Sequence, residues 1–599
     1  MSTFIRLTDY KSSDEKEEGF FKAENRYVAK QEDFEKIPGS PIAYWVSNRV
    51  KGIFEQGEKF LNIADPKTGM ATSDNTKFLR IWTEIEFLKF GRNFYNREDA
   101  KESLNKWFPY NKGGTFRKWF GNIEHVVDWE NDGFNIKKYK EDGLRSGKIT
   151  ANNSKCWNQS WYFKESLTWS ALSSGGFGAR YNPIGSVFDV SGACAFPSEK
   201  QRNYCLSFLI SNIANDMLKI LAPTINFQVG DVKSLPIIFP KSDITEQTID
   251  TLTQQNIDIS KEEWDSRETS WDFTCNALLK HNEDGSLEKA YEGYCAYWAE
   301  KFHTLHANEE ELNRLFIEIY ELQDELTPDV ALSDITILKN EATIEEGKLV
   351  FKADEIIKQF ISYGVGVLFG RYSLDHEGLH VANMHQSLVE ANASFNISSP
   401  SFEADEDNII PVLEDDYFKD DITARFIQFV KVAFGEASLH VNVKFIENAL
   451  GTSLRKYFVK GFYEDHIKRY KKRPIYWMVS SPKKGFMSLS YMHRYESDLF
   501  GRVRNSYLGE YITKLEAHKE SLEHTINSSS ATDKDKKDAD KRIKEIEVKL
   551  KELIAFDREK MMRFAQQHTD IDLDDGVKVN YTKFQDILFP IAGLSDEEK

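Results

Sequence analysis

The sequence is poor in cysteine and has no long apolar run. Its five cysteines are scattered through 599 residues without a Cys-x-x-Cys pair, which excludes a disulfide framework and a zinc finger and is typical of a reducing compartment. The N-terminus has no apolar signal core. The most apolar run, 205–225, is interrupted by polar and charged side chains, and it predicts a buried helix from Cys205 to Leu221 rather than a membrane span. We therefore expect a cytoplasmic protein that does not enter a membrane.

Two catalytic signatures are also missing. The glycine-rich stretch LSSGGFGARYNPIGSVFD (172–189) has Ala179 and Arg180 after its last close-set glycine, where a phosphate-binding loop requires a lysine and a hydroxyl. Its 181–183 segment, Tyr-Asn-Pro, blocks the helix that a dinucleotide-type cradle needs. The Asn-Pro-Ile-Gly at 182–185 lacks the second proline and the aromatic residue of the Asn-Pro-Pro-aromatic motif of amino-methyltransferases, and that motif occurs nowhere else. The stretch is therefore not predicted to be an active site.

Two further motifs match cofactor or metal patterns only formally. His376 to His380 reads HEGLH, but a zinc site requires this motif on a helix, and Gly378 with polar flanks predicts a loop with coincidental histidines. Gly364 and Gly366 lie in the amphipathic stretch ADEIIKQFISYGVGVLF with no strand before it. This pattern predicts a helix that packs closely on small residues. We expect no catalytic residue, metal site or cofactor site in this chain.

Charge is distributed unevenly along an acidic chain. The formal net charge is -18, from 78 basic and 96 acidic residues. Residues 101–180 carry 13 basic and 8 acidic residues, and residues 451–510 carry 13 and 5, whereas residues 403–421 carry nine acidic residues and one lysine. The negative total does not exclude nucleic acid, because binding depends on a local basic face.

The pattern along the chain predicts an α+β multi-domain protein, and at roughly 150 residues per domain the length suggests three or four domains. A charged tail ends at the turn signature IPGSP, and a later polar stretch, NSSSATDKDKK, separates two heptad-like runs. The predicted segments are a tail (1–40), a compact α/β domain (41–240), a helical segment (241–330), a mixed α/β domain with a basic stretch (331–506), an antiparallel helical hairpin (507–568) and a short tail (569–599).

Two basic stretches are interleaved with aromatic residues. They are KWFPYNKGGTFRKWFGN (106–122) and HIKRYKKRPIYWMVSSPKKG (466–485). Such runs suit phosphate contact combined with stacking on bases or sugars. The alternative is a solvated charged face beside buried aromatic rings. Two runs in an acidic protein favour nucleic-acid binding.

Several longer stretches resemble one family. They are IPGSPIAYWVS (37–47), SSGGFGARYNPIGSVFDVSG (173–192), INFQVGDVKSLPI (225–237), ISKEEWDSRETSWDF (259–273), LFIEIYELQDELTPDV (315–330), ISYGVGVLFGRYSLD (361–375), KRPIYWMVSSPKKGF (472–486) and DLDDGVKVNY (572–581). Together they resemble the PglX-type adenine-specific DNA methyltransferases of BREX bacteriophage-exclusion systems. The resemblance covers essentially the whole chain, and its Gln-Val-Gly-Asp part is shared with the specificity domains of type IIG restriction-modification enzymes.

The resemblance implies a part of a larger enzyme. In that family a Rossmann-like catalytic domain, with the S-adenosylmethionine loop and the Asn-Pro-Pro-aromatic motif, precedes the specificity half, and this chain resembles only the C-terminal half. Residues 1–40 would then be the linker from a missing catalytic domain, and the gene would be split or truncated, or Met1 would be an internal start. S-adenosylmethionine is expected only in the complete enzyme, and this chain alone is expected to be inactive.

Two functions follow as hypotheses. The first is the DNA-recognition half of an N6-adenine methyltransferase that marks a short host motif in phage defence when joined to its catalytic half. The second is an inactive remnant that acts as a DNA-binding or scaffolding subunit of the defence complex. The expected partners are double-stranded DNA, the missing N-terminal methyltransferase domain or subunit and other BREX proteins.

The resemblance also implies where DNA contacts lie. Residues 41–240 correspond to a target-recognition domain and residues 241–330 to a helical spacer. Glycine has no Cβ, so the 172–189 stretch would allow backbone amides to approach a groove. The residues expected to contact DNA are Lys112, Arg117, Lys118, Ser173, Ser174, Arg180, Tyr181 and Asn182, with Lys471, Lys472 and Arg473 as phosphate contacts.

Overall fold

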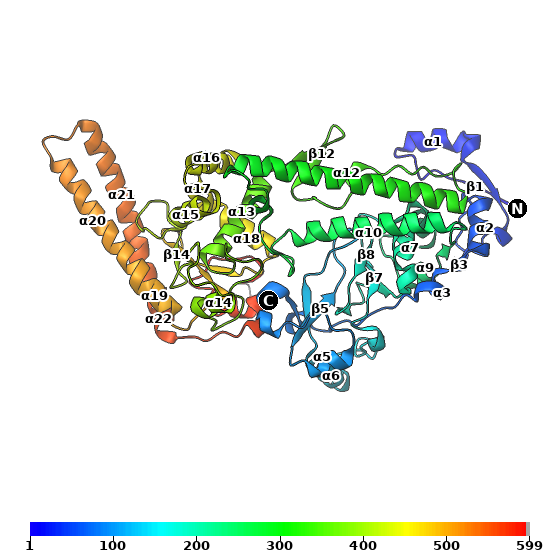
Figure 1. Cartoon of the computed structure of the whole chain (residues 1–599), viewed down its shortest axis with the longest axis horizontal. Helices are drawn as coiled ribbons and strands as arrows, with labels where there is room; N and C mark the ends of the chain where they lie inside the picture. Colours follow the sequence, from blue (N-terminus) through cyan, green and yellow to red (C-terminus); the bar gives the residue numbers. More distant parts are fainter. Residues whose placement is uncertain (595–599) are drawn as a thin grey trace. The chain divides into compact units, whose positions relative to one another are not determined.

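The structure is a computed structural model that describes residues 1–594 (Figure 1). The chain forms two compact units, and each is assembled from three separate stretches of sequence. Unit 1 comprises Met1–Leu79, Gly91–Trp264 and Ala299–Lys339, and unit 2 comprises Arg80–Phe90, Asp265–Trp298 and Asn340–Lys599. The fold is mixed α/β and multi-domain, as the sequence predicts. Within the described range, no helix has the length and apolarity needed to cross a bilayer.

Unit 1 contains short strands and mostly short helices. Its strands are β1 (Ser2–Ile5), β2 (Arg26–Ala29), β3 (Glu58–Lys59), β5 (Trp107–Asn111), β6 (His125–Asp128), β7 (Ser166–Trp169), β8 (Ala179–Asn182), β9 (Val187–Phe188), β10 (Cys194–Ala195) and β11 (Pro236–Ile237). Its helices are α1 (Ser13–Phe21), α2 (Asn48–Gln56), α3 (Phe60–Ala64), α4 (Asn75–Phe78), α5 (Arg97–Glu102), α6 (Glu130–Arg145), α7 (Glu199–Ile210), α8 (Asn212–Leu221), α9 (Val229–Lys233) and α10 (Asp243–Asp265, whose last residue belongs to unit 2).

The strands of unit 1 form small sheets around an aromatic core. Strand β7 pairs antiparallel with both β8 and β10, while β5 pairs antiparallel with β6 and parallel with β9. Strand β5 is buried at all five positions, so its side chains pack on both faces of the sheet. The rings of Phe108 and Phe163 lie 5.6 Å apart, and those of Trp129 and Tyr162 lie 5.3 Å apart. Edge-to-face packing of this kind holds the short strands together.

The most apolar run of the sequence forms two helices rather than one. The sequence predicts a continuous helix from Cys205 to Leu221, but α7 ends at Ile210 and α8 begins at Asn212. The residue between them, Ser211, has extended backbone angles, and its hydroxyl accepts a hydrogen bond from the backbone of Ala214. Serine competes for helix hydrogen bonds in this way and is a preferred N-cap. The cap therefore starts a new helix inside the run.

Unit 2 is dominated by helices. Its strands are β4 (Leu79–Ile81, beginning at the last residue of a unit 1 stretch), β12 (Ala342–Glu345), β13 (Lys348–Phe351), β14 (Ile410–Pro411), β15 (Tyr476–Ser480) and β16 (Met487–Tyr491). Its helices are α11 (Ala277–Lys280), α13 (Ala353–Leu368), α14 (Leu388–Ser394), α15 (Ile422–Phe434), α16 (Leu439–Leu450), α17 (Leu454–Lys460), α18 (Phe462–Arg469), α19 (Leu499–Arg502), α20 (Gly509–Asn527), α21 (Asp533–Phe556), α22 (Met562–Gln567) and α23 (Gly576–Thr582). Helix α12 (Leu287–Tyr320) starts in unit 2, and its residues from Ala299 belong to unit 1.

Helix α13 shows why its glycines are needed. A Cβ on Gly364 would lie 2.6 Å from the ring of Phe426 and 2.8 Å from the ring of Phe429. A Cβ on Gly366 would lie 2.5 Å from the ring of Tyr372. Both glycines therefore make room for aromatic rings from neighbouring segments. The prediction of a closely packed helix, rather than a cofactor loop, is confirmed.

The two helices near the C-terminus pair as a hairpin. Figure 1 shows α20 and α21 lying side by side, joined by residues 528–532. An ion pair of 2.7 Å connects Lys519 to Glu547 across the hairpin. At the base of the hairpin, Val503–Leu508 and Asp557–Met561 are π-helical. These two segments contact each other and are joined by Arg504, which donates two hydrogen bonds, of 2.6 and 3.0 Å, to the carboxylate of Asp557.

Candidate nucleic-acid interface

The structure brings together the two stretches of unit 1 that the sequence singles out. The backbone amide of Trp119 donates to the carbonyl of Ala179 (3.0 Å), and the amide of Tyr181 donates to the carbonyl of Trp119 (2.7 Å). A Cβ on Gly175 would lie 2.7 Å from the Cβ of Phe116. Segment 112–122 therefore packs along β8 and the glycine turn that precedes it. Gly175 is required for this internal packing, which is a different use from the groove approach expected above.

Arg117 is buried beneath this contact. Its guanidinium donates to the carboxylate of Glu263 (2.5 Å) and to the backbone carbonyl of Phe120 (2.5 Å). It also lies over the ring of Trp264, 5.1 Å from the ring centroid. A buried charge of this kind is tolerated because a partner charge and several acceptors replace water. Arg117 therefore has a folding role in unit 1, and its predicted contact with DNA stays a prediction.

Lys118 is buried in the same manner. Its ammonium pairs with Glu309, a residue of α12 that is itself buried. The other carboxylate oxygen of Glu309 accepts a 2.7 Å hydrogen bond from the indole of Trp119. One carboxylate thus satisfies two neighbouring side chains of the basic stretch. Lys118 and Trp119 belong to the basic, aromatic stretch that predicted a binding face, and here both connect segment 112–122 to α12 through Glu309.

Arg180 and Asn182 point into the interior from β8. Arg180 is 1% exposed, and burial, with a smaller contribution from Arg117, lowers the pKa of its guanidinium to about 10. The amide of Asn182 donates to the hydroxyls of Ser166 and Ser186, at 2.9 and 2.8 Å. Neither side chain reaches the surface in this conformation. Their expected contact with DNA is untested, and it would require this part of unit 1 to open.

The remaining predicted residues of unit 1 differ in accessibility. Ser174 is exposed, whereas Ser173 is buried. Lys112 is half-buried, and desolvation lowers the pKa of its ammonium group. The hydroxyl of Tyr181 donates to the carboxylate of Glu165 (2.6 Å), and burial, together with that carboxylate, raises the pKa of the phenol. Ser174, Lys112 and the edge of Tyr181 are therefore the predicted residues that a ligand could reach directly.

A pocket of about 270 Å³ opens beside the glycine turn. Gly175, Gly176 and Phe116 line one side, and the start of α8, including Asn212 and Asn215, lines another. Acidic and basic side chains both reach the pocket, so it has no dominant charge. Its amide and backbone groups could form hydrogen bonds with a polar ligand.

The predicted phosphate contacts of unit 2 lie in the turn between α18 and β15. Lys471 and Lys472 are exposed and have φ angles of 51° and 61°, in the left-handed region. The Lys472 ammonium donates to the carbonyl of Ala592 (3.2 Å), and Arg473 lies 3.8 Å from the carboxylate of Glu84. The turn therefore presents its two lysines at the surface, while Arg473 is partly occupied by an internal carboxylate.

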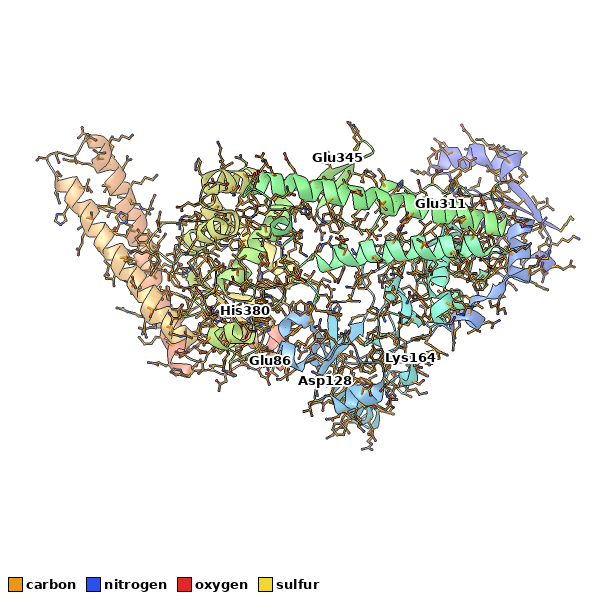
Figure 2. All side chains as sticks on the ribbon, in the orientation of Figure 1. Glu86, Asp128, Lys164, Glu311, Glu345 and His380 are labelled. Carbon is orange, nitrogen blue, oxygen red and sulfur yellow. The ribbon has the colours of Figure 1, made fainter. Side chains whose placement is uncertain are left out.

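The HEGLH motif lies in a loop, which confirms the prediction that it is not helical. His376 Nε2 lies 2.8 Å from His380 Nδ1, and the ring of Phe395 stacks on His376 at 3.6 Å (His380 is labelled in Figure 2). Burial lowers the pKa of His380 to about 4. The two rings thus bond to each other rather than facing a shared ligand. Across residues 1–594, no group of three or more histidine, cysteine or acidic side chains is placed to hold a metal ion.

The acidic partners of the basic stretch are the residues that sequence reasoning missed. Glu263 lies 146 residues from Arg117, and Glu309 lies 191 residues from Lys118. No local pattern connects such positions. Glu263 lies on α10 and Glu309 on α12. The sequence pattern predicts helices here, but it does not predict which surface each helix packs against.

Comparison with known proteins gives two strong similarities. No protein-family model matches the chain. The chain is 37% identical over 609 aligned positions to the adenine-specific methyltransferase PglX of Lacticaseibacillus casei (strain Zhang), which covers 98% of this chain and 48% of that protein. It is 33% identical over 598 positions to the adenine-specific methyltransferase BrxX of Escherichia coli O9:H4 (strain HS), which covers 94% of this chain and 46% of that protein. The chain spans about half the length of the curated relatives it matches, and over nearly its whole length it is a homologue of these adenine-specific methyltransferases.

Proposed function

We propose that this chain is the DNA-recognition part of an adenine-specific DNA methyltransferase of the BREX type. Acting with a catalytic part, it would direct N6-adenine methylation to a short host motif. One observation carries the proposal: the chain is similar over 98% of its length to about half of a methyltransferase, yet its 599 residues contain no Asn-Pro-Pro-aromatic motif. That motif binds the flipped adenine in this chemistry.

S-adenosylmethionine is the cofactor that methyltransferases generally use, and the glycine turn of unit 1 does not fit it. In a Rossmann-type site the glycine loop comes directly after a parallel strand, and a helix begins at that loop. Gly175, Gly176 and Gly178 instead lie between β7 and β8, which pair antiparallel. A Cβ on Gly178 would lie 2.8 Å from the carbonyl of Arg117, so this backbone faces protein. We therefore assign cofactor binding and methyl transfer to the catalytic part.

The proposal also assigns roles to segments. Residues 41–240 would carry target recognition, residues 241–330 would serve as a helical spacer, and residues 331–506 with the hairpin 507–568 would clamp the duplex. The partners would be double-stranded DNA, the catalytic domain or subunit and other BREX proteins. The accessible members of the predicted contact set include Ser174, Lys112, the edge of Tyr181, Lys471 and Lys472, and they support contact at the surface of both units.

DNA binding and methylation can be measured separately on the full chain. Fluorescence anisotropy measures binding to a labelled 40-bp duplex at several salt concentrations. The logarithm of the binding constant should fall linearly with the logarithm of the salt concentration, because phosphate contacts release counterions. Incubation with tritiated S-adenosylmethionine and host DNA should give no methylation by the chain alone.

Each outcome decides between functions. Salt-dependent binding without methylation supports the proposal. Absence of DNA binding at low salt would overturn it in favour of a scaffolding subunit. Methylation by the chain alone would contradict the assignment of catalysis to another part.

A further inference from the structure

Helix α6 and the segment after it form an exposed basic surface that none of the predicted contact residues belongs to. Residues 137–155 contain six basic and two acidic residues, in a protein of net charge -18. Of the six, only Lys140 is buried. We call Phe134, Lys138, Arg145, Lys148 and Lys155 the α6 surface; all five side chains are exposed, Phe134 by 58%.

The start of α6 is held in an unusual backbone conformation. Asn131, Asp132 and Gly133 are consecutive left-handed residues, with φ of 48°, 60° and 72°. Asparagine, aspartate and glycine tolerate this region, but usually as single residues, so a run of three depends on the surroundings that hold the turn. Two cations do so: Arg97 donates from Nε to Asp132 at 2.8 Å and Lys137 donates to Asp132 at 2.7 Å.

A second set of contacts fixes the orientation of the turn. The amide of Asn135 donates to the carboxylate of Asp128 (3.2 Å), at the end of β6 and labelled in Figure 2. The amide of Gly133 donates to the carbonyl of Trp129 (3.0 Å), and a Cβ on Gly133 would lie 2.6 Å from the Trp129 ring. The strained turn is thus anchored to the sheet, and the next residue, Phe134, is presented to solvent from a rigid base.

The segment after α6 is also anchored. The buried ammonium of Lys140 donates to the carbonyl of Lys155 (3.1 Å), and the side chain of Ile149 fills the space that a Cβ on Gly143 would take. The amide of Asn158 donates to the carbonyl of Thr68 (2.8 Å). Lys148 and Lys155 are therefore carried on backbone that is tied to α6 and to unit 1.

We propose that the α6 surface is the principal DNA-backbone contact of unit 1, an inference that rests on the proposed function. Lys138, Arg145, Lys148 and Lys155 supply the cations for phosphates, and the Phe134 ring supplies an apolar contact to a sugar or base at the edge of the footprint. The groove along α6, about 520 Å³, is lined by Lys101, Lys138 and Arg145 together with Glu141 and Asp142. The basic stretch 106–122 is a weaker source of such contacts because Arg117 and Lys118 are buried and paired.

The test is the anisotropy titration of the full chain with a labelled 40-bp duplex of mixed sequence. The variant K138E/R145E/K148E removes three proposed phosphate contacts. The matched control, K59E/K200E/K241E, makes the same change in net charge at three other exposed lysines of unit 1. We expect the α6 variant to lower the salt slope by about 2.7, at about 0.9 per phosphate, with an affinity loss of tenfold or more, while the control keeps the slope of the unmodified chain.

A second pair of variants tests the aromatic contact. Phe134→Ala should weaken binding by about tenfold, the loss expected when one phenylalanine side chain is no longer buried against the duplex, and should leave the salt slope unchanged. Tyr95→Ala, at a residue 69% exposed in the same unit, should bind like the unmodified chain. Thermal melting shows that each variant is folded.

The outcomes separate the two proposals. If the unmodified chain binds no DNA, the proposed function fails. If the chain binds and the α6 variant matches its charge-matched control in slope and affinity, the proposed function stands and the α6 surface is not its contact.

Discussion

Replacing Arg117 by methionine should unfold unit 1 at a lower temperature rather than only weaken DNA binding. Methionine keeps an apolar side chain over Trp264 but removes the guanidinium that pairs with Glu263 at 2.5 Å. Glu263 is 1% exposed. Its carboxylate would keep the 2.8 Å hydrogen bond from the amide of Leu338, but it would lose the charge and hydrogen bond of the Arg117 guanidinium at a buried position.

The magnitude follows from the burial of both partners. Breaking a buried ion pair by removing one member costs about 3–5 kcal/mol, because the other charge stays desolvated. For a unit of this size, each kcal/mol lowers the melting temperature by about 2–4 °C. Arg117→Met should therefore lower the melting of unit 1 by roughly 10 °C. Glu263→Met should give a loss of the same order, and the double variant should recover part of it, because both charges of the buried pair are then replaced by apolar side chains.

Differential scanning calorimetry and hydrogen exchange on unit 1 peptides measure this effect. Lys112→Met is the control in the same stretch, since this side chain is half-exposed and its loss should change stability by less than about 0.5 kcal/mol. The reasoning is refuted if Arg117→Met melts with the unmodified chain and loses only DNA affinity, because Arg117 would then be a contact residue whose burial is incidental.

Three further predictions concern unit 2 and one helix of unit 1. Gly364→Ala should destabilise unit 2 by about 1–3 kcal/mol, because the added methyl group would overpack two phenylalanine rings. Gly52→Ala in α2, where a Cβ meets nothing within 4 Å, should instead stabilise unit 1 by about 0.5–1 kcal/mol. Urea denaturation of the two variants measures both changes in the free energy of unfolding. Burial, with the neighbouring carboxylate of Asp407, raises the pKa of Asp405 to about 7. The folded state therefore holds this proton more tightly than the unfolded state, and stability falls as pH rises from about 4 to 7. Asp405→Asn should flatten the slope of stability against pH between about pH 4 and 7, and an unchanged slope would contradict the assignment. Arg504→Ala should increase amide exchange in the two π-helical segments, because it removes both hydrogen bonds to Asp557; exchange that stays equal would show that the pairing does not hold the hairpin base.

The elements that the sequence predicts are those with a strong local pattern. The paired helices between residues 507 and 568, the helix around Gly364 and Gly366, and the loop at 376–380 are all confirmed. In each, periodicity, glycine placement or a polar loop is enough to define the structure. The break at Ser211 was missed because an internal N-cap leaves the apolar pattern of the flanking helices unchanged.

The burial of the basic stretch could not be predicted for a different reason. Lysine and arginine side chains are mostly exposed in folded proteins. Residue type alone therefore predicts that Arg117, Lys118 and Arg180 lie at the surface. Their burial depends on carboxylates and carbonyls that the tertiary fold supplies from distant segments. The sequence around the exposed cations of α6 does not differ in pattern from the sequence around the buried Arg117, Lys118 and Arg180. Only the three-dimensional structure shows which cations are exposed.

The discontinuous make-up of unit 1 has a consequence for synthesis on the ribosome. The chain emerges from its N-terminus, yet the carboxylates that neutralise Arg117 and Lys118 belong to Glu263 and Glu309. Until α10 has left the exit tunnel Arg117 must remain hydrated, and until the Glu309 part of α12 has left it Lys118 must remain hydrated, so the interior that both later occupy cannot close. A nascent chain ending near residue 240 would therefore expose apolar surface to solvent and to chaperones. Unit 1 would acquire its protease resistance only after about residue 339 has emerged.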